Sequence, residues 1–174
     1  TVEDRVVTRW ADQSGYGRHA TADVATGPAL VGGAIHGDGS QHLRLSRLVP
    51  LEGDCTVVFV AAFDGNADEE SLGAVIGDGD DGWIGVTPDG RLSTRFSSPD
   101  RGWRTSPFGD PSDRAVWAVV RRRRDGGNWK NGRYISAREG VSQTTMNVGV
   151  VMGMREDANR MAGALSELIV FDTA

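Results

Sequence analysis

The sequence predicts an all-β protein, an antiparallel sandwich or barrel, on three observations. Glycine supplies 24 of the 174 residues, about twice its usual share. Proline supplies only 6, so the glycine excess indicates tight turns rather than a collagen-like repeat. Short apolar runs also alternate with polar residues at period two, and turn-forming residues separate these runs at regular intervals. Together the three observations favour many short strands joined by tight turns.

Three runs in the first third of the chain are predicted strands. Val6–Trp10 is the first. Residues 42–48 alternate strictly between apolar and polar, which is typical of a strand with one face in water. Cys55–Phe63 is apolar throughout, so we expect a central strand that is covered on both faces. The lone cysteine, Cys55, lies in this run and is expected to be a buried apolar residue.

Later strands are predicted around turn residues. Trp83–Val86 and Arg91–Phe96 flank the turn residues 88–90, Pro-Asp-Gly, in which proline presets φ and glycine accepts a positive φ. Ala115–Val120 is expected to pair with Asn128–Ala137 across 124–127. The last two predicted strands, which bring the total to about ten, are 146–154 and 165–171.

One segment fits two interpretations. Met154, Ala158, Met161 and Leu165 have the spacing of an amphipathic helix. Gly163 lies inside this segment, however, and the residues after it are rich in β-formers. We therefore favour a loop over 155–162 that runs into the last strand. No internal repeat or linker is apparent, and a chain of this length fits a single domain over 1–174. Both ends are expected to be cuts through a longer polypeptide.

Composition and charge exclude several classes of function. The chain is 39% apolar and 25% charged, which argues against disorder. No apolar run has the length needed to cross a membrane. The net charge of −5 argues against nucleic-acid binding, and the run 121–124 of four arginines would be divided between two faces of a strand. Residues 77–82 fit G-x-G-x-x-G, but a strand and not a helix is predicted next, which excludes a dinucleotide site.

Four segments carry motifs, in this order along the chain: Val7-x-x-Trp10-x-Asp12-x-Ser14-Gly15-x-Gly17, residues 37–45, Trp129-x-Asn131-Gly132 and residues 162–172. Together they resemble LamG-like domains of the concanavalin A-like lectin/glucanase superfamily. The resemblance implies a jelly roll, with two antiparallel sheets face to face and the N- and C-terminal strands paired. It implies no single activity, since the superfamily includes lectins, glycosidases, lyases, adhesion modules and virion domains.

The motif residues also have structural explanations. Asp12 and Ser14 can accept hydrogen bonds from the main chain in a glycine-containing turn. The pair 131–132, Asn-Gly, is preferred in a type I′ hairpin turn. Trp10 and Trp117 lie in predicted strands and are expected in the core, whereas Trp83 and Trp129 fit either a buried or an exposed position.

Catalytic machinery is not apparent. A retaining glycosidase needs two carboxyl groups about 5–5.5 Å apart, which the family's glucanases place on one strand. Glu69 and Glu70 are adjacent and would point to opposite faces of a strand, and Glu167 has no carboxylate two residues away. The histidines lack the spacing of zinc ligands. The sequence therefore predicts a protein that is not an enzyme.

Acidic loops suggest a structural calcium ion. Carboxylate and amide oxygens recur at short intervals in two clusters, as calcium loops require: Asp64, Asn66 and Asp68 in the first, and Asp78, Asp80 and Asp81 in the second. The alternative is that these aspartates cap their own turns. Both interpretations stay open on the sequence alone.

The loop 97–113 is the candidate ligand-binding segment. It combines two aromatic residues, Trp103 and Phe108, with two arginines, Arg101 and Arg104. Aromatic rings pack on the C–H face of a sugar, and guanidinium groups donate to hydroxyls or carboxylates. The alternative is that Trp103 folds back to cover the edge of the sheet.

Three functional hypotheses follow. The first is a non-catalytic carbohydrate-binding or adhesion module that tethers a larger extracellular or virion protein, such as a phage tail protein, to a glycan surface. The second is a structural domain that docks other subunits of a virion or tail assembly. The third is a degenerate glycoside hydrolase or polysaccharide lyase.

Overall fold

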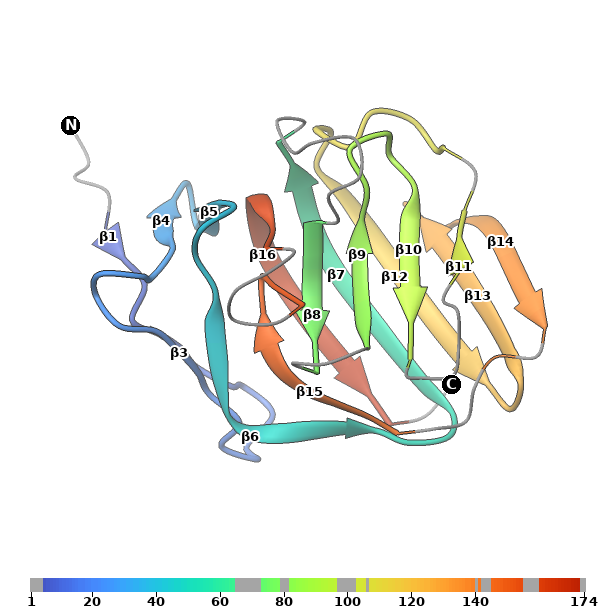
Figure 1. The fold of residues 1–174 in the computed structure, drawn as a ribbon, viewed down its shortest axis with the longest axis horizontal. Helices are drawn as coiled ribbons and strands as arrows, with labels where there is room; N and C mark the ends of the chain where they lie inside the picture. Colours follow the sequence, from blue (N-terminus) through green and yellow to red (C-terminus); the bar gives the residue numbers. More distant parts are fainter. Residues whose placement is uncertain are drawn as a thin grey trace.

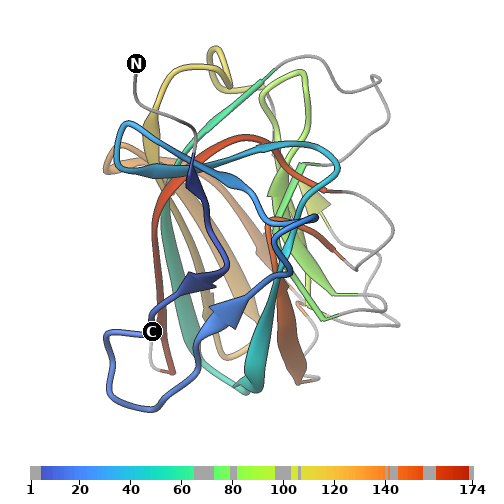
Figure 2. The same cartoon turned by 90° about the vertical axis from the view of Figure 1, so that its left-hand side faces the viewer.

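Two antiparallel sheets pack face to face in the computed structural model (Figures 1 and 2). The residues that the structure describes are 5–64, 73–78, 82–96, 103–105, 107–139, 141, 145–154 and 160–172. They contain no helix, and hence none that is long and apolar enough to cross a bilayer. The predicted all-β sandwich is therefore confirmed.

Each sheet has eight strands within the described residues. Sheet A has the order β1 (Arg5–Val6), β4 (Ala29–Val31), β5 (Ala34–Asp38), β16 (Ala162–Phe171), β7 (Cys55–Phe63), β12 (Ala115–Arg122), β13 (Asp125–Lys130) and β14 (Arg133–Glu139). Sheet B has the order β11 (Trp103–Arg104), β10 (Leu92–Arg95), β9 (Trp83–Val86), β8 (Gly73–Gly77), β15 (Met146–Val151), β6 (Leu43–Leu51), β3 (Ala20–Thr21) and β2 (Arg9–Trp10).

The core lies between the sheets and centres on β7 and β12. Alternate residues of β7 from Cys55 to Phe63 are buried, and the residues between them are half-buried. The sequence predicts full cover on both faces of this strand, so the outer face is less buried than expected. Trp117 of β12 is fully buried, with its ring stacked on Phe59 at 6.3 Å between centroids. Trp10 is half-buried against the same core.

The N-terminal region differs from the prediction. The chain bends between β1 and β2, so Val6–Trp10 is not one strand. β1 pairs with β4 in sheet A and β2 pairs with β3 in sheet B, so these few residues pass from one sheet to the other. The resemblance implies that the terminal strands pair. Instead, β16 lies between β5 and β7, and β4 and β5 separate it from β1.

In the hairpins of sheet A, the strands also begin and end at other residues than the sequence predicts. Asn131 and Gly132 have φ of 51° and 75°, which confirms the type I′ turn. This turn divides the predicted strand Asn128–Ala137 into β13 and β14. The turn between β12 and β13 consists of Arg123 and Arg124, earlier than predicted. The described residues contain more strands than the expected ten, partly because four of them, β1, β2, β3 and β11, are only two residues long. Such short strands depend on pairing with a neighbouring strand, which a local pattern does not reveal.

The last strand forms, but it begins three residues earlier than predicted. β16 begins at Ala162 and is the longest strand of sheet A. Residues 155–159, where a loop was favoured over a helix, lie outside the described part of the chain. β8, β9 and β10 form consecutive hairpins of sheet B, in the front layer of Figure 1. These strands and β11 position the candidate site.

Candidate functional site

Four side chains share the outer face of sheet B at β9, β10 and β11. Arg95 lies opposite Trp83, and Ser93 lies opposite Arg104. Residues that face each other in an antiparallel pair project to the same side, and so do residues two apart in one strand. Thr94, which lies between Ser93 and Arg95 in the strand, is fully buried, and Leu92, which precedes Ser93, belongs to the core. Trp83, Ser93, Arg95 and Arg104 therefore lie on one face of the sheet, where Arg104 is exposed, Trp83 and Arg95 are half-buried and Ser93 is buried. We call these four residues the arginine patch.

Contacts within the arginine patch fix the indole and one guanidinium. Nε1–H of Trp83 donates to the Oγ atom of Ser93 at 3.1 Å. The guanidinium carbon of Arg95 lies 5.2 Å from the centroid of the Trp83 ring, within the range of a cation–π contact. Trp83 is half-buried and also packs against Ala74 and Met154. The ring thus packs against the guanidinium of Arg95, a residue that is itself half-buried.

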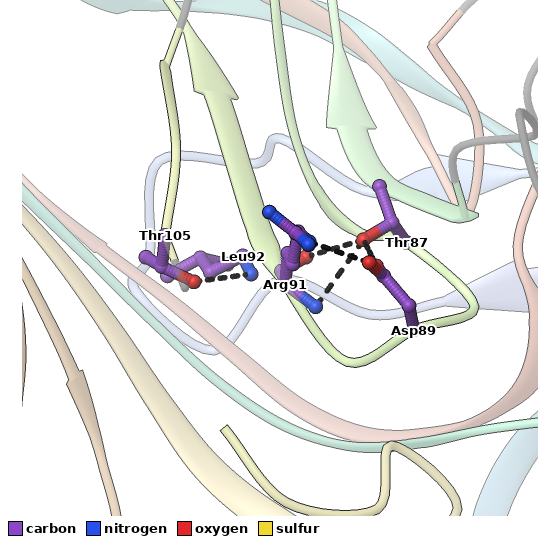
Figure 3. A network of polar contacts seen from close by, with 5 residues as sticks. All are labelled: Thr87, Asp89, Arg91, Leu92 and Thr105. Atoms are coloured by element: carbon purple, nitrogen blue, oxygen red, sulfur yellow. Dashed lines mark hydrogen bonds and ion pairs between the residues drawn. The ribbon is translucent and has the colours of Figure 1, made fainter. Parts of the chain in front are cut away.

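Arg104 is the exposed member of the arginine patch. Its strand, β11, is short, and Thr105 holds it against β10. The main-chain N–H of Thr105 donates to the carbonyl oxygen of Leu92 at 3.0 Å, and the N–H of Leu92 donates to Oγ1 of Thr105 at 3.0 Å (Figure 3). Arg104 is therefore carried by an anchored backbone.

The turn between β9 and β10 has the composition that the sequence predicts. Oγ1 of Thr87 donates to Asp89, and Nε of Arg91 donates to the same carboxylate, both at 2.5 Å (Figure 3). The Thr87 hydroxyl is the main cause that lowers the pKa of Asp89, with Arg91 contributing. Gly90 has φ of 76°. This local network closes the hairpin that carries three of the four residues of the arginine patch.

Of the four predicted ligand-binding residues, the structure describes the side chains of two, Arg104 and Phe108. Arg104 lies in the arginine patch. The backbone of Trp103 belongs to β11, but its side chain lies outside the description, as does Arg101. Phe108 is half-buried, and its ring lies 5.2 Å from the guanidinium carbon of Arg133, at the start of β14 in the other sheet. A ligand role for Phe108, Trp103 and Arg101 stays a prediction.

Lys130 anchors the loop that follows β11. Its Nζ donates to the carbonyl oxygens of Phe108 and Asp110 at 3.1 and 3.2 Å, and lies 4.7 Å from the centroid of the Trp117 ring. The N–H of Phe108 donates to the carbonyl of Gly90 at 3.2 Å. The loop is thus tied to β13 of sheet A and to the β9–β10 turn of sheet B.

The predicted calcium ligands are only partly described. Asp64 is exposed, with Oδ2 at 3.3 Å from Nε2 of His36. Asp78 accepts a hydrogen bond from the N–H of Gly82 at 2.9 Å, a local capping contact. Asn66, Asp68, Asp80 and Asp81 lie outside the described residues. Within the described part of the chain, no three His, Cys, Asp or Glu side chains group as metal ligands would. Calcium binding stays a prediction.

Sequence reasoning missed Arg95 and Ser93 and left Trp83 undecided. The available signal was the alternation in residues 92–95, which predicts that Ser93 and Arg95 share a face. What the sequence could not supply is the register with β9 and β11, which brings Trp83 and Arg104 to the same face.

Comparisons with known proteins show the same fold. No family model matches the chain, and no curated protein matches its sequence. The CBM40 module of the Ruminococcus gnavus IT-sialidase, bound to α2,3-sialyllactose, is similar with a TM-score of 0.62 and 14% identity, over 81% of this chain and 90% of that one. Domain 4 of AbnA, a GH43 extracellular arabinanase of Geobacillus stearothermophilus in complex with arabinotriose, is similar with a TM-score of 0.56 and 14% identity, over 99% and 79%.

A sialidase of Trypanosoma rangeli is also similar, with a TM-score of 0.62 and 10% identity, but this chain covers only 29% of its length. Carbohydrate-binding modules are therefore among the proteins that share this β-sandwich fold.

Proposed function

We propose that this chain is a non-catalytic carbohydrate-binding module and that it binds a glycan at the arginine patch. The observation that carries the proposal is the fixed cluster of Trp83, Ser93 and Arg95, with Arg104 directly beside it. Two of the similar structures hold a bound saccharide, sialyllactose in one and arabinotriose in the other. Both lend support to a glycan as the partner here.

The chemistry of the arginine patch suits binding. Each guanidinium presents planar donors that meet sugar hydroxyls or carboxylates in pairs. Strands hold such donors in place better than loops do, which reduces the entropy lost on binding. None of the four side chains is a carboxylic acid, whereas glycoside hydrolysis uses a pair of them. A binding role is therefore favoured over a degenerate hydrolase.

A carbohydrate-binding module of this kind would hold a larger protein at a glycan surface. We place that protein outside the cell or on a virion, for example in a phage tail. Calcium is proposed as a structural ion of the acidic segments around Asp64 and Asp78.

Substitution of Arg104 tests the proposed site. Because the side chain is exposed, Arg104→Ala should fold normally and yet lose binding on a glycan array. Arg122→Ala removes an exposed arginine from sheet A, on the other side of the sandwich, and should bind as the parent does. An array with no signal for the parent protein, with and without calcium, would refute the proposed function.

A second candidate function, docking to other subunits of an assembly, is favoured by the outer face of sheet A. Large apolar side chains are exposed there, including Val116 at 44%, Ile169 at 43% and Tyr134 at 52%. Extended apolar patches often mark interaction sites. Co-sedimentation with assembly subunits that is lost in Ile169→Asp, but kept in Arg104→Ala, would favour this function over glycan binding.

A further inference from the structure

We propose that the outer face of sheet A carries a second sugar-binding site, formed by Trp129 and Tyr134, and that its ligand is an uncharged pyranose chain. We call these two residues the aromatic platform. The inference goes beyond the proposed function, because the aromatic platform and the arginine patch lie on the outer faces of different sheets. It rests on that function only in taking a glycan as the partner.

Trp129 projects from the outer face of sheet A. Its two neighbours in β13, Asn128 and Lys130, are buried, and Nζ of Lys130 lies 4.7 Å from the ring centroid of the core residue Trp117. Successive residues of a strand point to opposite faces of the sheet. The indole of Trp129 therefore lies on the outside of the sandwich, where it is half-buried.

The indole of Trp129 lies flat on the sheet. The position that a Cβ atom of Gly127 would occupy is 2.5 Å from Cη2 of Trp129 and 2.7 Å from Cζ3. The six-membered part of the indole therefore covers the main chain of Gly127, which is buried beneath it. Only glycine leaves room for this position of the ring. One face of the indole rests on the strand, and the other face points away from it.

Tyr134 adds a wall beside the indole. It lies opposite Trp129 in the register of β13 and β14, and it is 52% exposed. The two ring centroids are 5.4 Å apart, and the ring planes meet at 65°. The aromatic platform therefore has a floor, the indole, and a side, the phenol ring. The C–H face of a pyranose can pack on the floor while its edge contacts the side.

The polar atoms of the aromatic platform are available to a ligand. Neither Nε1–H of Trp129 nor the hydroxyl of Tyr134 has a hydrogen-bond partner among the residues that the structure describes, and Nε1 of Trp129 is open to solvent. Nε1–H of Trp83, in contrast, already donates to Ser93. Sugar hydroxyls both donate and accept, so they can bond to the indole N–H and to the phenol.

The hairpin that carries the aromatic platform is held in place before any ligand binds. The N–H of Asn131 in its turn donates to the carbonyl oxygen of Val116 at 2.7 Å, and the N–H of Val116 donates to Oδ1 of Asn131 at 2.9 Å. These bonds tie the turn between β13 and β14 to β12, the next strand of the back layer in Figure 1. Little order is then lost on binding.

The surroundings of the aromatic platform are uncharged, which indicates the class of sugar. Across the sheet, Trp129 is in register with Ala118 and Val58, and Gly127 is in register with Val120. A carboxylate or sulfate placed over these residues would lose water and gain no cation in return. A neutral sugar has no such cost, and the small side chains beside the indole leave room for a chain to continue. Binding at the aromatic platform should therefore depend little on salt.

Native electrophoresis in gels that contain a soluble polysaccharide tests the inference. The neutral probes are arabinoxylan, galactomannan and hydroxyethylcellulose, and carboxymethylcellulose is a charged probe with the same backbone as the last. Each gel is run at low and at high salt. Tyr134→Ala removes the exposed side of the aromatic platform. Tyr16→Ala is the matched control, because it removes a tyrosine that is 69% exposed in the loop between β2 and β3.

We expect at least one neutral polysaccharide to retard the parent protein, to a similar extent at both salt concentrations. Tyr134→Ala and Trp129→Ala should each weaken this binding about ten-fold, as the loss of one aromatic contact implies. Tyr134→Phe keeps the ring and should keep most of the affinity. Tyr16→Ala and Arg104→Ala should bind as the parent does. Thermal melts identify any variant that fails to fold, and Tyr134→Ala, at an exposed position, then decides the outcome.

The outcomes separate this inference from the proposed function. Equal retardation of Tyr134→Ala and Tyr16→Ala overturns the aromatic platform, and a loss in Arg104→Ala alone would then assign all binding to the arginine patch. Preference for carboxymethylcellulose overturns the uncharged ligand. If no neutral polysaccharide retards the parent, the inference fails, whereas the glycan array still decides the proposed function. Co-sedimentation with assembly subunits that Tyr134→Ala abolishes, without any retardation by polysaccharide, would assign this face to protein docking.

Discussion

Lys130 and Arg121 show how this sandwich accommodates charge in its interior. Both are buried, and both donate to main-chain carbonyls of distant segments. Arg121 donates to the carbonyls of Leu51 and Gly53, and its guanidinium carbon lies 4.3 Å from the centroid of the Phe96 ring. Each cation replaces its lost hydration with carbonyl dipoles and an aromatic face. The burial of these two cations could not be predicted from their sequence neighbours, because the carbonyl oxygens that they bind come from segments far away in the chain.

Removing the Lys130 amine should destabilise the protein. Lys130→Ala leaves the carbonyls of Phe108 and Asp110 without this donor and opens space beside Trp117. We expect a loss of about 2 kcal/mol or more in the free energy of unfolding, measured with urea. Among the described residues, Arg133 contacts the same loop through its cation–π contact with Phe108, and Arg133→Ala should cost about 0.5–1 kcal/mol. Equal losses in the two variants would contradict this role of Lys130.

Asp12 should contribute to stability in a pH-dependent way. The Ser14 hydroxyl is the main cause that lowers the pKa of Asp12 from 3.8 to about 2. The carboxylate also accepts from the main-chain N–H of Arg18 at 2.9 Å and of Ser14 at 2.8 Å, which lowers the pKa further. The folded protein therefore holds the charged form at a lower pH than the unfolded chain does. This stabilisation is present above about pH 4 and is lost as the pH falls towards 2.

Thermal melts between pH 7 and pH 2 test this contribution. Asp12→Asn should melt at a lower temperature at pH 7 and should lose less of its stability on acidification than the parent. Asp113→Asn removes an exposed carboxylate elsewhere and should follow the parent curve. If Asp12→Asn also follows the parent curve, the charge of Asp12 does not contribute to the stability of the folded protein.

At the scale of elements, prediction succeeded where the cause is local. The Asn131-Gly132 pair determines its own turn, since both residues have positive φ. The apolar run of β7 is central because no other run is as continuous. Prediction failed where an element depends on its partner. The predicted strand Val6–Trp10 is an example. Its first residue pairs with β4 in sheet A and its last two residues pair with β3 in sheet B.

Gly163 illustrates a constraint that only the assembled sheet reveals. It has φ of 132°, and a Cβ there would overlap the carbonyl oxygen of Ala62. Gly163→Ala should therefore cost about 3 kcal/mol or more, through both strain and displacement of β7. Gly53→Ala is a matched control, since φ is 54° but nothing lies near its Cβ; strain alone costs about 1–2 kcal/mol there. Urea unfolding should rank the two in this order, and the reverse ranking would contradict the predicted overlap.

At the scale of the whole molecule, the sequence predicted the two-sheet architecture but not the composition of the arginine patch. Residue alternation and turn signals indicate an antiparallel sandwich or barrel, because a single sheet would expose an apolar face. The choice of two sheets face to face came from the resemblance to LamG-like domains. The patch joins three strands, and its members come together only through their register. Arg104 was a candidate because it lies in a predicted loop with aromatic residues. Arg95 was not, because it lies in a predicted strand, where the alternating pattern is explained by folding alone. A binding surface on a sheet is thus harder to predict than one on a loop.

The two layers should unfold as one unit, which also tests the prediction of a single domain. Cys55 faces the space between the sheets, is fully buried, and packs in the same cluster as residues of both sheets. Burial raises the pKa of its thiol, so the reactive thiolate is scarce in the folded state. A thiol reagent should therefore label Cys55 only after the sheets separate. Across a urea series, the labelled fraction and the tryptophan fluorescence should change at the same midpoint. Labelling at urea concentrations where the fluorescence is still native would mean that the sheets open separately, and the chain would then not behave as one cooperative domain.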